Sequence, residues 1–448
     1  MLSLLRTSRS RVARVGTGAV AALATVITGL ASALPAQAAN VVTPGSFTGH
    51  GFDQCTAPSQ QAMNAWRLRS PYFAAGIYIS GDSRGCTSQP NLSARWVSKQ
   101  LAGGWRLLPI TLGPQASCTT RARYRHQVRI SPRPAGSYAR ARQQGRAEAR
   151  KTVRAAARLG ITRGSTLWYD IEAFSISARH CRESALGFLS AWTNQLHRRH
   201  YVSGIYSSAA SGLRMLDDAR ATRPGRYRMP DQVWIADWNG SATTSSRYVR
   251  SDGWTPHRRV HQYRGGHVER YGGVAINIDN NWVDLGRGSR IGREATHCGG
   301  AASYNFGAYA TRDAGDRGRL VRTVQCLLTR KGYFHRRVSG FYSARLGAAV
   351  SRYRVAHGLP AGTATTQRTW VTLLSEGSVP VLKRGSAATS VRRVQRALNA
   401  ADRAGLRVTG VFGSRTAGAV RRYQRAHGRV VSGVVTPAMW RQLQRGTL

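Results

Sequence analysis

The C-terminal part of this 448-residue chain contains two copies of one segment, and this repeat restricts the folds open to that part. The first copy has a set of apolar, aromatic and glycine positions that recurs 70 residues later (394 − 324) without insertion or deletion. These positions are Val321, Val324, Gln325, Leu328, Gly340, Val350, Tyr353, His357, Gly358, Trp370 and Leu373, and their counterparts run from Val391 to Leu443. Chance does not keep one register over so many positions, so these are two copies of one module.

Each copy has the apolar spacing of a small helical unit. Val321, Val324 and Leu328 lie at i, i+3 and i+7, which is one face of a helix. A turn at Gly340 follows, then a second apolar stripe around Val350, and a third short helix would carry the repeated tryptophan. We therefore expect three short helices in each copy.

The second copy carries motifs at residues 391–398, 410–416 and 419–424 and closes with Trp440. This pattern resembles the three-helix peptidoglycan-binding modules of bacterial cell-wall hydrolases. The first copy departs from it at Ser343, Leu346 and Arg354, where the second has Gly413, Thr416 and Gln424. Two alternatives stay open for the first copy, ligand binding or a role as a spacer, and either copy could be a helical module without a ligand.

The N-terminus has the composition of a secretory signal peptide. Four arginines precede an apolar stretch that ends in Ala36-Gln37-Ala38. We expect a signal peptide at 1–38, a barrel at 46–286, a linker at 287–315, and modules at 316–376 and 384–446. The resulting protein would be secreted and associated with the cell wall, without stable membrane insertion after cleavage.

Cysteine and charge content agree with export. Six cysteines, without Cys-x-x-Cys or His-Glu-x-x-His spacing, favour disulfides over a metal site, and we expect no metal or cofactor. Spacing alone does not determine connectivity; the pairing that we predict is Cys55–Cys86, Cys118–Cys181 and Cys298–Cys326.

The net charge of +48 implies attraction to polyanions. The arginines are scattered rather than gathered with aromatics, so an anionic wall glycan is expected as partner and nucleic acid is not.

Residues 51–285 have the length and alternation of a (β/α)₈ barrel. Apolar, β-branched runs predict eight strands, at 50–53, 74–80, 106–112, 166–172, 201–207, 232–237, 259–263 and 275–279. Helical patterns lie between them at 59–69, 91–102, 139–159 and 181–200. The expected fold class is therefore an α/β barrel of the TIM type followed by two small all-α modules, and a monomer is our default.

Acidic residues fall at the predicted strand ends, although the chain has only 19 of them. They are Asp53, Asp170, Glu172, Asp237 and Asp279. Residues at the C-terminal ends of barrel strands meet at one mouth, where active sites form. Crowded carboxylates raise one another's pKa, which suits general acid catalysis.

The motifs around these acids resemble a known family. Gly51-Phe52-Asp53, residues 168–172, residues 234–238, residues 261–263 and Ile278-Asp279 follow the order seen in the lysozyme-type muramidases of glycoside hydrolase family 25. The stretch is still more similar to exported actinobacterial barrels labelled glycoside-hydrolase-like, whose hallmarks here are residues 51–58, 201–206 and 271–274.

The resemblance implies roles for individual residues. Glu172 would be the general acid, Asp170 would stabilise the intermediate, and Asp53, Asp237 and Asp279 would orient substrate and tune Glu172. Substrate contacts would come from Trp168, Tyr206, Trp238, Gln262 and Tyr263.

We therefore predict a secreted cell-wall glycoside hydrolase that cleaves a polymer of N-acetylated sugars, with peptidoglycan favoured. The alternative is a non-catalytic wall-binding protein whose mouth acids pair with the abundant arginines. A third, weaker reading is a polyanion-binding protein that depends on charge alone.

Overall fold

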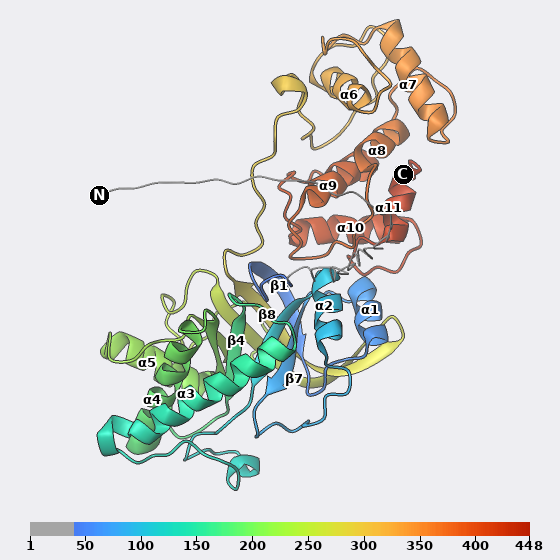
Figure 1. Cartoon of the computed structure of the whole chain (residues 1–448). Helices are drawn as coiled ribbons and strands as arrows, with labels where there is room; N and C mark the ends of the chain where they lie inside the picture. The colour runs from blue at the N-terminus through green and yellow to red at the C-terminus, as the bar shows by residue number, and fades with distance from the viewer. Residues whose placement is uncertain (1–39) are drawn as a thin grey trace, which may run out of the picture. The chain divides into compact units, whose positions relative to one another are not determined.

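A computed structural model describes residues 40–448, and the predicted signal peptide at 1–38 lies outside the described residues. Eight strands close into one barrel in chain order, which confirms the predicted barrel class (Figure 1). The strands are β1 (Phe47–Asp53), β2 (Ala74–Ser80), β3 (Arg106–Thr111), β4 (Thr166–Ile171), β5 (Val202–Ser208), β6 (Gln232–Ala236), β7 (Arg258–Tyr271) and β8 (Val274–Leu285). Strands β1 to β7 are parallel to their neighbours in that order.

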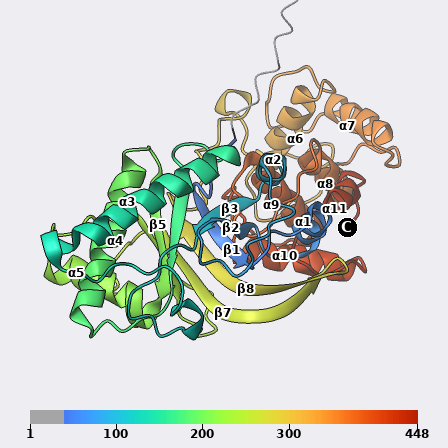
Figure 2. The ribbon, with the colours of Figure 1, turned by 60° about the horizontal axis from the view of Figure 1, so that its bottom comes forward.

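The last strand differs from a (β/α)₈ barrel because it runs in the opposite direction. Strand β8 pairs antiparallel with both β7 and β1. Strands β7 and β8 form a long curved hairpin, joined at Gly272 and Gly273, which both have positive φ (Figure 2). A two-residue glycine turn of this kind matches the twist of a hairpin. The strands predicted at 259–263 and 275–279 are therefore the first parts of two longer strands, β7 and β8.

Five helices follow the first five strands, and within residues 40–448 no α-helix lies between β6 and β7 or between β7 and β8. They are α1 (Gln60–Arg69), α2 (Ala94–Ala102), α3 (Ala135–Arg158), α4 (Arg179–His197) and α5 (Arg214–Thr222), with short helical turns η1 (Ala122–Tyr124), η2 (Ala209–Leu213) and η3 (Cys298–Gly300) elsewhere. The hydroxyls of Ser59 and Ser93 cap α1 and α2 by accepting from Ala62 N and Trp96 N. Helices α3 and α4 lie side by side (Figure 1), and Gly145 allows this because a Cβ there would come within 2.3 Å of Phe188 O.

The two repeats fold into three helices each, as predicted. The first contains α6 (Arg319–Arg330), α7 (Ala344–Ala356) and α8 (Gln367–Ser375), and the second contains α9 (Thr389–Asp402), α10 (Ser414–Ala426) and α11 (Pro437–Gln444). Buried residues of both repeats belong to one hydrophobic cluster, in which Leu373, Leu374, Val391 and Val394 take part. The two copies therefore share a core.

The repeated polar residues hold each copy together internally. Gln325 accepts from Gly340 N at 2.8 Å, and Gln395 accepts from Gly410 N at 3.0 Å, so each glutamine fixes the glycine turn of its copy. The indole N–H of Trp370 donates to Ala310 O at 2.9 Å. Its counterpart Trp440 donates to Pro380 O at 2.8 Å, again 70 residues later (380 − 310). These repeated residues thus explain the fold of the module, and none of these bonds requires a ligand.

All three predicted disulfides are present, Cys55–Cys86, Cys118–Cys181 and Cys298–Cys326. Cys55 and Cys86 join the segment after β1 to the segment after β2, and Cys118–Cys181 joins the long loop after β3 to the start of α4. Both bonds therefore brace segments that follow the carboxyl ends of barrel strands. Among residues 40–448, none of the helices combines the length and apolar character that crossing a bilayer requires.

Candidate active site

The predicted acids meet at one end of the barrel. Asp279 also lies there, but inside a strand and not at a strand end as predicted. Asp53 ends β1, Asp170 lies near the end of β4, and Glu172 directly follows that strand. Asp279 lies inside β8, where the antiparallel register places it opposite Asp53. Because β8 runs backwards, an interior residue of this strand reaches the mouth at which the parallel strands end.

Gln262 on β7 joins Asp53 and Asp279. Its Nε2 donates to both oxygens of Asp53, at 3.1 and 2.9 Å, and approaches Asp279 Oδ2 at 3.3 Å. Asn281 Nδ2 also donates to Asp53 Oδ1 at 3.4 Å. Burial, with the charge of Asp279, raises the pKa of the Asp53 carboxyl well above its ordinary value, and burial raises the pKa of Asp279. A proton is therefore favoured on this pair of carboxyls.

Asp170 lies deep in the mouth and is almost wholly buried. Tyr78 Oη donates to its Oδ2 at 3.2 Å, while its Oδ1 has no hydrogen-bond partner within the described residues. Burial raises the pKa of Asp170 well above its ordinary value, and the charge of Glu172 adds to this shift. Asp170 lines neither of the two mouth cavities, so this acceptor without a partner is enclosed beside Glu172 rather than open to them.

Glu172 stands where two cavities meet. One cavity, of about 200 Å³, also contains Asp53, Asp279 and Arg123, and the other, of about 290 Å³, contains Asp237. Glu172 is the residue common to both linings. A side chain that faces both cavities can reach a bond between two units of a chain laid across them.

The protonation of Glu172 depends on opposing effects. Burial raises the pKa of its carboxyl, whereas the positive charges of Arg121 and Arg123 oppose the rise. Arg121 Nε lies 3.7 Å from Glu172 Oε2 and is more than half exposed. Gln115 accepts from the Glu172 backbone N–H at 2.8 Å and donates to Asp170 O at 2.9 Å, so it fixes the backbone between the two acids.

The aromatic residues predicted to hold substrate divide into two groups. Trp238 is 63% exposed and donates from Nε1 to Gln262 Oε1 at 2.9 Å, and Tyr206 Oη donates to the same oxygen at 3.0 Å. Both line the cavity that contains Asp237, whose Oδ2 accepts from Ser246 Oγ at 2.8 Å. The flat indole and phenol are therefore placed to cover one cavity.

Trp168 and Tyr263 lie apart from the two cavities. Trp168 is fully buried in the barrel and packs edge-on against Trp234, with ring centroids 5.5 Å apart, so it supports the mouth from below. Tyr263 follows Gln262 by one residue on β7, so its side chain points to the other face of the strand, near His261. Neither residue lines the two mouth cavities.

Several site residues escaped the sequence analysis. They are Tyr78, Gln115, Arg121, Arg123 and Asn281. Tyr78 lies on the predicted strand 74–80, so its position near a strand end was an available signal. The arginines belong to the loop after β3, where sequence pattern gives no guide to side-chain direction. Within residues 40–448, no cluster of three or more His, Cys, Asp or Glu side chains has the geometry to hold a metal ion.

Comparison with known protein families finds a match for two parts of the chain. Residues 64–283 match the family described as "Rv2525c-like, glycoside hydrolase-like domain", and residues 388–443 match the family described as "Putative peptidoglycan binding domain". No curated protein matches the sequence.

Two solved structures share limited similarity. An uncharacterized protein of B. stearothermophilus is 19% identical over 52% of this chain and 95% of its own, with a TM-score of 0.35. The modular autolysin LytC from Streptococcus pneumoniae is 11% identical over 52% of this chain, with a TM-score of 0.33. This chain spans 46% of LytC.

The two family matches fall on the barrel and on the second helical repeat. The chain therefore contains an Rv2525c-like glycoside hydrolase-like domain at residues 64–283, followed in the sequence by a peptidoglycan-binding domain at residues 388–443.

Proposed function

We propose that this protein is a secreted cell-wall glycoside hydrolase, with peptidoglycan as its polymer of N-acetylated sugars. One observation carries the proposal. Glu172 stands between two cavities at the barrel mouth, and burial raises the pKa of its carboxyl. A general acid must still hold its proton near neutral pH and must reach the oxygen of the bond between two sugars.

Glu172 would donate its proton to the glycosidic oxygen as that bond breaks. Asp170 lies two residues earlier on the same face of the strand, with one carboxyl oxygen unpartnered, and would stabilise the positive charge that develops on the sugar. In an N-acetylated substrate the acetamido oxygen can attack the anomeric carbon, and Asp170 would then orient the acetamido group. Water would afterwards release the sugar, returning a proton to Glu172.

The remaining mouth residues would hold the substrate and set the charge around Glu172. Asp53 and Asp279 share the amide of Gln262 and lie in one cavity with Glu172. Asp237, Trp238 and Tyr206 lie in the other, where the aromatic faces can pack on sugar rings. Arg121 would hold Glu172 in place before substrate enters.

The remainder of the chain supports a wall location. The second repeat matches a peptidoglycan-binding family, and three disulfides suit an oxidising compartment outside the cytoplasm. A wall-bound module keeps the barrel at high local concentration near its substrate without adding contacts to the active site.

The test is release of soluble fragments from insoluble peptidoglycan by the mature chain, followed by mass spectrometry. We expect wild-type protein to release fragments and Glu172→Gln to release none, while both variants pellet with the wall. The control is Asp252→Asn, which removes a carboxylate in the segment before β7 that is 69% exposed, pairs with Arg220 and lines neither mouth cavity. It should release fragments at the wild-type rate.

Two results would contradict this proposal. A fully active Glu172→Gln protein would remove Glu172 from the mechanism. Wild-type protein that pellets with the wall and releases nothing would instead support the non-catalytic alternative, in which Arg121 and Glu172 form a structural ion pair.

A further inference from the structure

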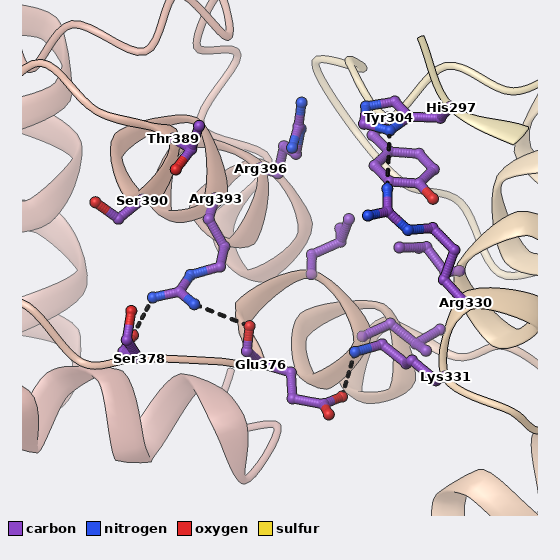
Figure 3. A pocket seen from close by; sticks show the side chains of 13 residues that line it. His297, Tyr304, Arg330, Lys331, Glu376, Ser378, Thr389, Ser390, Arg393 and Arg396 are labelled. Atoms are coloured by element: carbon purple, nitrogen blue, oxygen red, sulfur yellow. Dashed lines mark hydrogen bonds and ion pairs between the residues drawn. The ribbon is translucent and has the colours of Figure 1, made fainter. Parts of the chain in front are cut away.

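A cavity of about 420 Å³ lies between the two helical repeats, among α6, α8 and the first half of α9 (Figure 3). Leu327, Leu373 and Leu374 form its apolar side. Its polar side has hydroxyl groups from Thr389 and Ser390 at the first turn of α9. The volume falls in the range of pockets that bind small molecules, roughly 300 to 1,000 Å³. We call this cavity the inter-repeat cleft.

Four basic side chains face the inter-repeat cleft, against one carboxylate. They are Arg330 and Lys331 at the end of α6 and Arg393 and Arg396 on α9, and the carboxylate is Glu376. Lys331 is ion-paired with Glu376, and Arg396 is ion-paired with Glu294 of the segment that precedes the first repeat. These two cations are therefore neutralised within the protein.

Arg330 and Arg393 have no such partner. In the part of the chain that the structure describes, neither guanidinium forms an ion pair with a carboxylate. Arg330 Nη1 lies 3.3 Å from the ring nitrogen Nδ1 of His297. Arg393 donates to the carbonyl oxygens of Glu376, at 3.0 Å, and of Ser378, while its Nε has no partner. The cleft thus has two positive charges without a carboxylate partner, one from each repeat, and that of Arg393 lies 4.3 Å from the ring centre of Trp440.

The repeat itself shows that these charges are particular to the cleft. The positions 70 residues after Arg330 and Lys331 are Ala400 and Ala401, and the positions 70 residues before Arg393 and Arg396 are Thr323 and Cys326. None of the four cations therefore belongs to the pattern that folds each copy. They occur only where the end of α6 faces the start of α9.

We propose that the inter-repeat cleft binds an oxyanion of the wall polymer, a carboxylate or a phosphate, between Arg330 and Arg393. Guanidinium groups form their strongest hydrogen bonds with such anions, and the hydroxyls of Thr389 and Ser390 add donors beside them. The ligand's apolar or sugar portion would lie on Leu373 and Leu374. The inference depends on the proposed function only for the identity of the polymer. It also gives the first repeat, which departs from the family pattern, a role in binding.

The test measures binding by calorimetry to the mature Glu172→Gln chain, so that hydrolysis cannot interfere. The probes are an N-acetylmuramyl dipeptide with free carboxylates, the same dipeptide with its carboxylates amidated, and glycerol phosphate. We expect the carboxylated dipeptide or glycerol phosphate to bind, and the one that binds identifies the source of the anion. The amidated dipeptide should not bind.

Two substitutions should weaken this binding without unfolding the modules. Arg330→Gln removes an exposed cation and should weaken binding about tenfold, the usual loss of a charge-assisted hydrogen bond. Thr389→Glu adds a carboxylate at an exposed position in the first turn of α9 and should abolish binding. An acid there is favourable to the helix itself, so this variant should keep or gain thermal stability.

The matched control removes two exposed arginines of the repeats that do not line the cleft, Arg345→Gln with Arg422→Gln. It changes net charge by more than either test variant and should leave binding unchanged. Equal weakening by the control would show attraction by overall charge and overturn the proposal, as would equal binding of the amidated probe or no binding of any probe. Fragment release by wild-type protein without probe binding would retain the proposed function and reject only the cleft.

Discussion

At the scale of single residues, two glutamines organise the acids of the mouth. Gln262 donates to Asp53 and Asp279 and accepts from Tyr206 and Trp238 through its other amide atom. Gln115 does the same for the backbone around Asp170. The hydrogen bonds from Gln262 and Asn281 oppose the rise in the pKa of Asp53, but burial and the charge of Asp279 outweigh them, so the pKa stays raised.

The sequence predicted the acids better than the aromatics for a physical reason. Scarce carboxylates at strand ends are costly, so their positions carry information about a site. Trp168 obeys the same alternation as Asp170, but it lies two residues deeper and fills the barrel. Alternation gives the face of a strand and not the depth at which a side chain lies.

Asp53→Asn should become more stable relative to the wild type as pH rises. Since the pKa of Asp53 is raised in the folded state, the folded protein holds a proton that the unfolded chain releases above its ordinary pKa. The wild type therefore loses stability between that ordinary pKa and the raised one, whereas the asparagine variant does not titrate there. The asparagine amide can still donate to Asp279. Urea unfolding of both proteins from pH 4 to pH 8 measures the difference.

The control for this prediction has the opposite sign. The hydrogen bond from Arg220 lowers the pKa of Asp252, so its stabilising effect is present above the ordinary pKa and lost as pH falls. Asp252→Asn should therefore become less stable relative to the wild type as pH rises. If Asp53→Asn, like Asp252→Asn, becomes less stable relative to the wild type as pH rises, the proton assigned to Asp53 is absent.

At the scale of elements, the β7–β8 hairpin is the part of the barrel whose strand length and direction the apolar pattern did not predict. The apolar pattern predicts an end at Asp279 because Asn280 and Asn281 follow, yet the strand continues to Leu285. Asn281 accepts from Trp234 Nε1 at 2.7 Å and Asn280 donates to Tyr72 Oη at 2.6 Å, so hydrogen bonds rather than apolar character bury them. The direction of β8 was readable from Gly272-Gly273, a two-residue hairpin turn, but the alternation of strands and helices favoured a parallel strand.

The helices of the repeats were predictable because their signal occurs twice. Gln395 shows why the polar positions recur. Its side chain is buried, and its Nε2 donates to Val411 O at 3.1 Å and Thr416 Oγ1 at 3.0 Å while its Oε1 accepts from Gly410 N. One residue thereby joins α9 to the turn and to the start of α10.

Gln395→Ala should destabilise the second repeat by about 2 to 3 kcal/mol, because it leaves the buried groups of the turn without partners. Urea unfolding of the mature chain measures the loss. The control is Gln444→Ala on α11, whose side chain bonds only to Ser375 O and Gly377 O at the edge of the first repeat. A loss no larger for Gln395 than for Gln444 would contradict the role assigned to the repeated glutamine.

At the scale of the whole molecule, a buried lysine and its neighbour Arg384, which lies 4.4 Å from the ring centre of Trp282, connect the second repeat to the barrel. Lys383 precedes α9 and is fully buried, and its Nζ donates to Ser70 O at 3.0 Å and Tyr72 O at 2.9 Å. It also lies 5.2 Å from the ring centre of Phe73. The corresponding residue of the first repeat is Asp313, 70 residues earlier, so this contact is made by one copy only. Family resemblance describes each domain separately and gives no sign of it.

Lys383→Met should separate the unfolding of the barrel from that of the repeats. Methionine keeps the apolar stem but leaves the carbonyl oxygens of Ser70 and Tyr72 without a donor, which costs about 2 kcal/mol or more. We expect one calorimetric transition for the wild type and two for the variant.

Burial lowers the pKa of Lys383 well below its ordinary value, so the unfolded chain binds the proton more tightly. The stability of the wild type relative to the variant should therefore increase from pH 6 to pH 9, since deprotonating the unfolded chain becomes easier. Lys99→Met, at an exposed position of α2, should change neither the number of transitions nor their pH dependence. A Lys383→Met protein that still unfolds in one transition at the wild-type temperature would show that the barrel and the repeats are held together without this lysine.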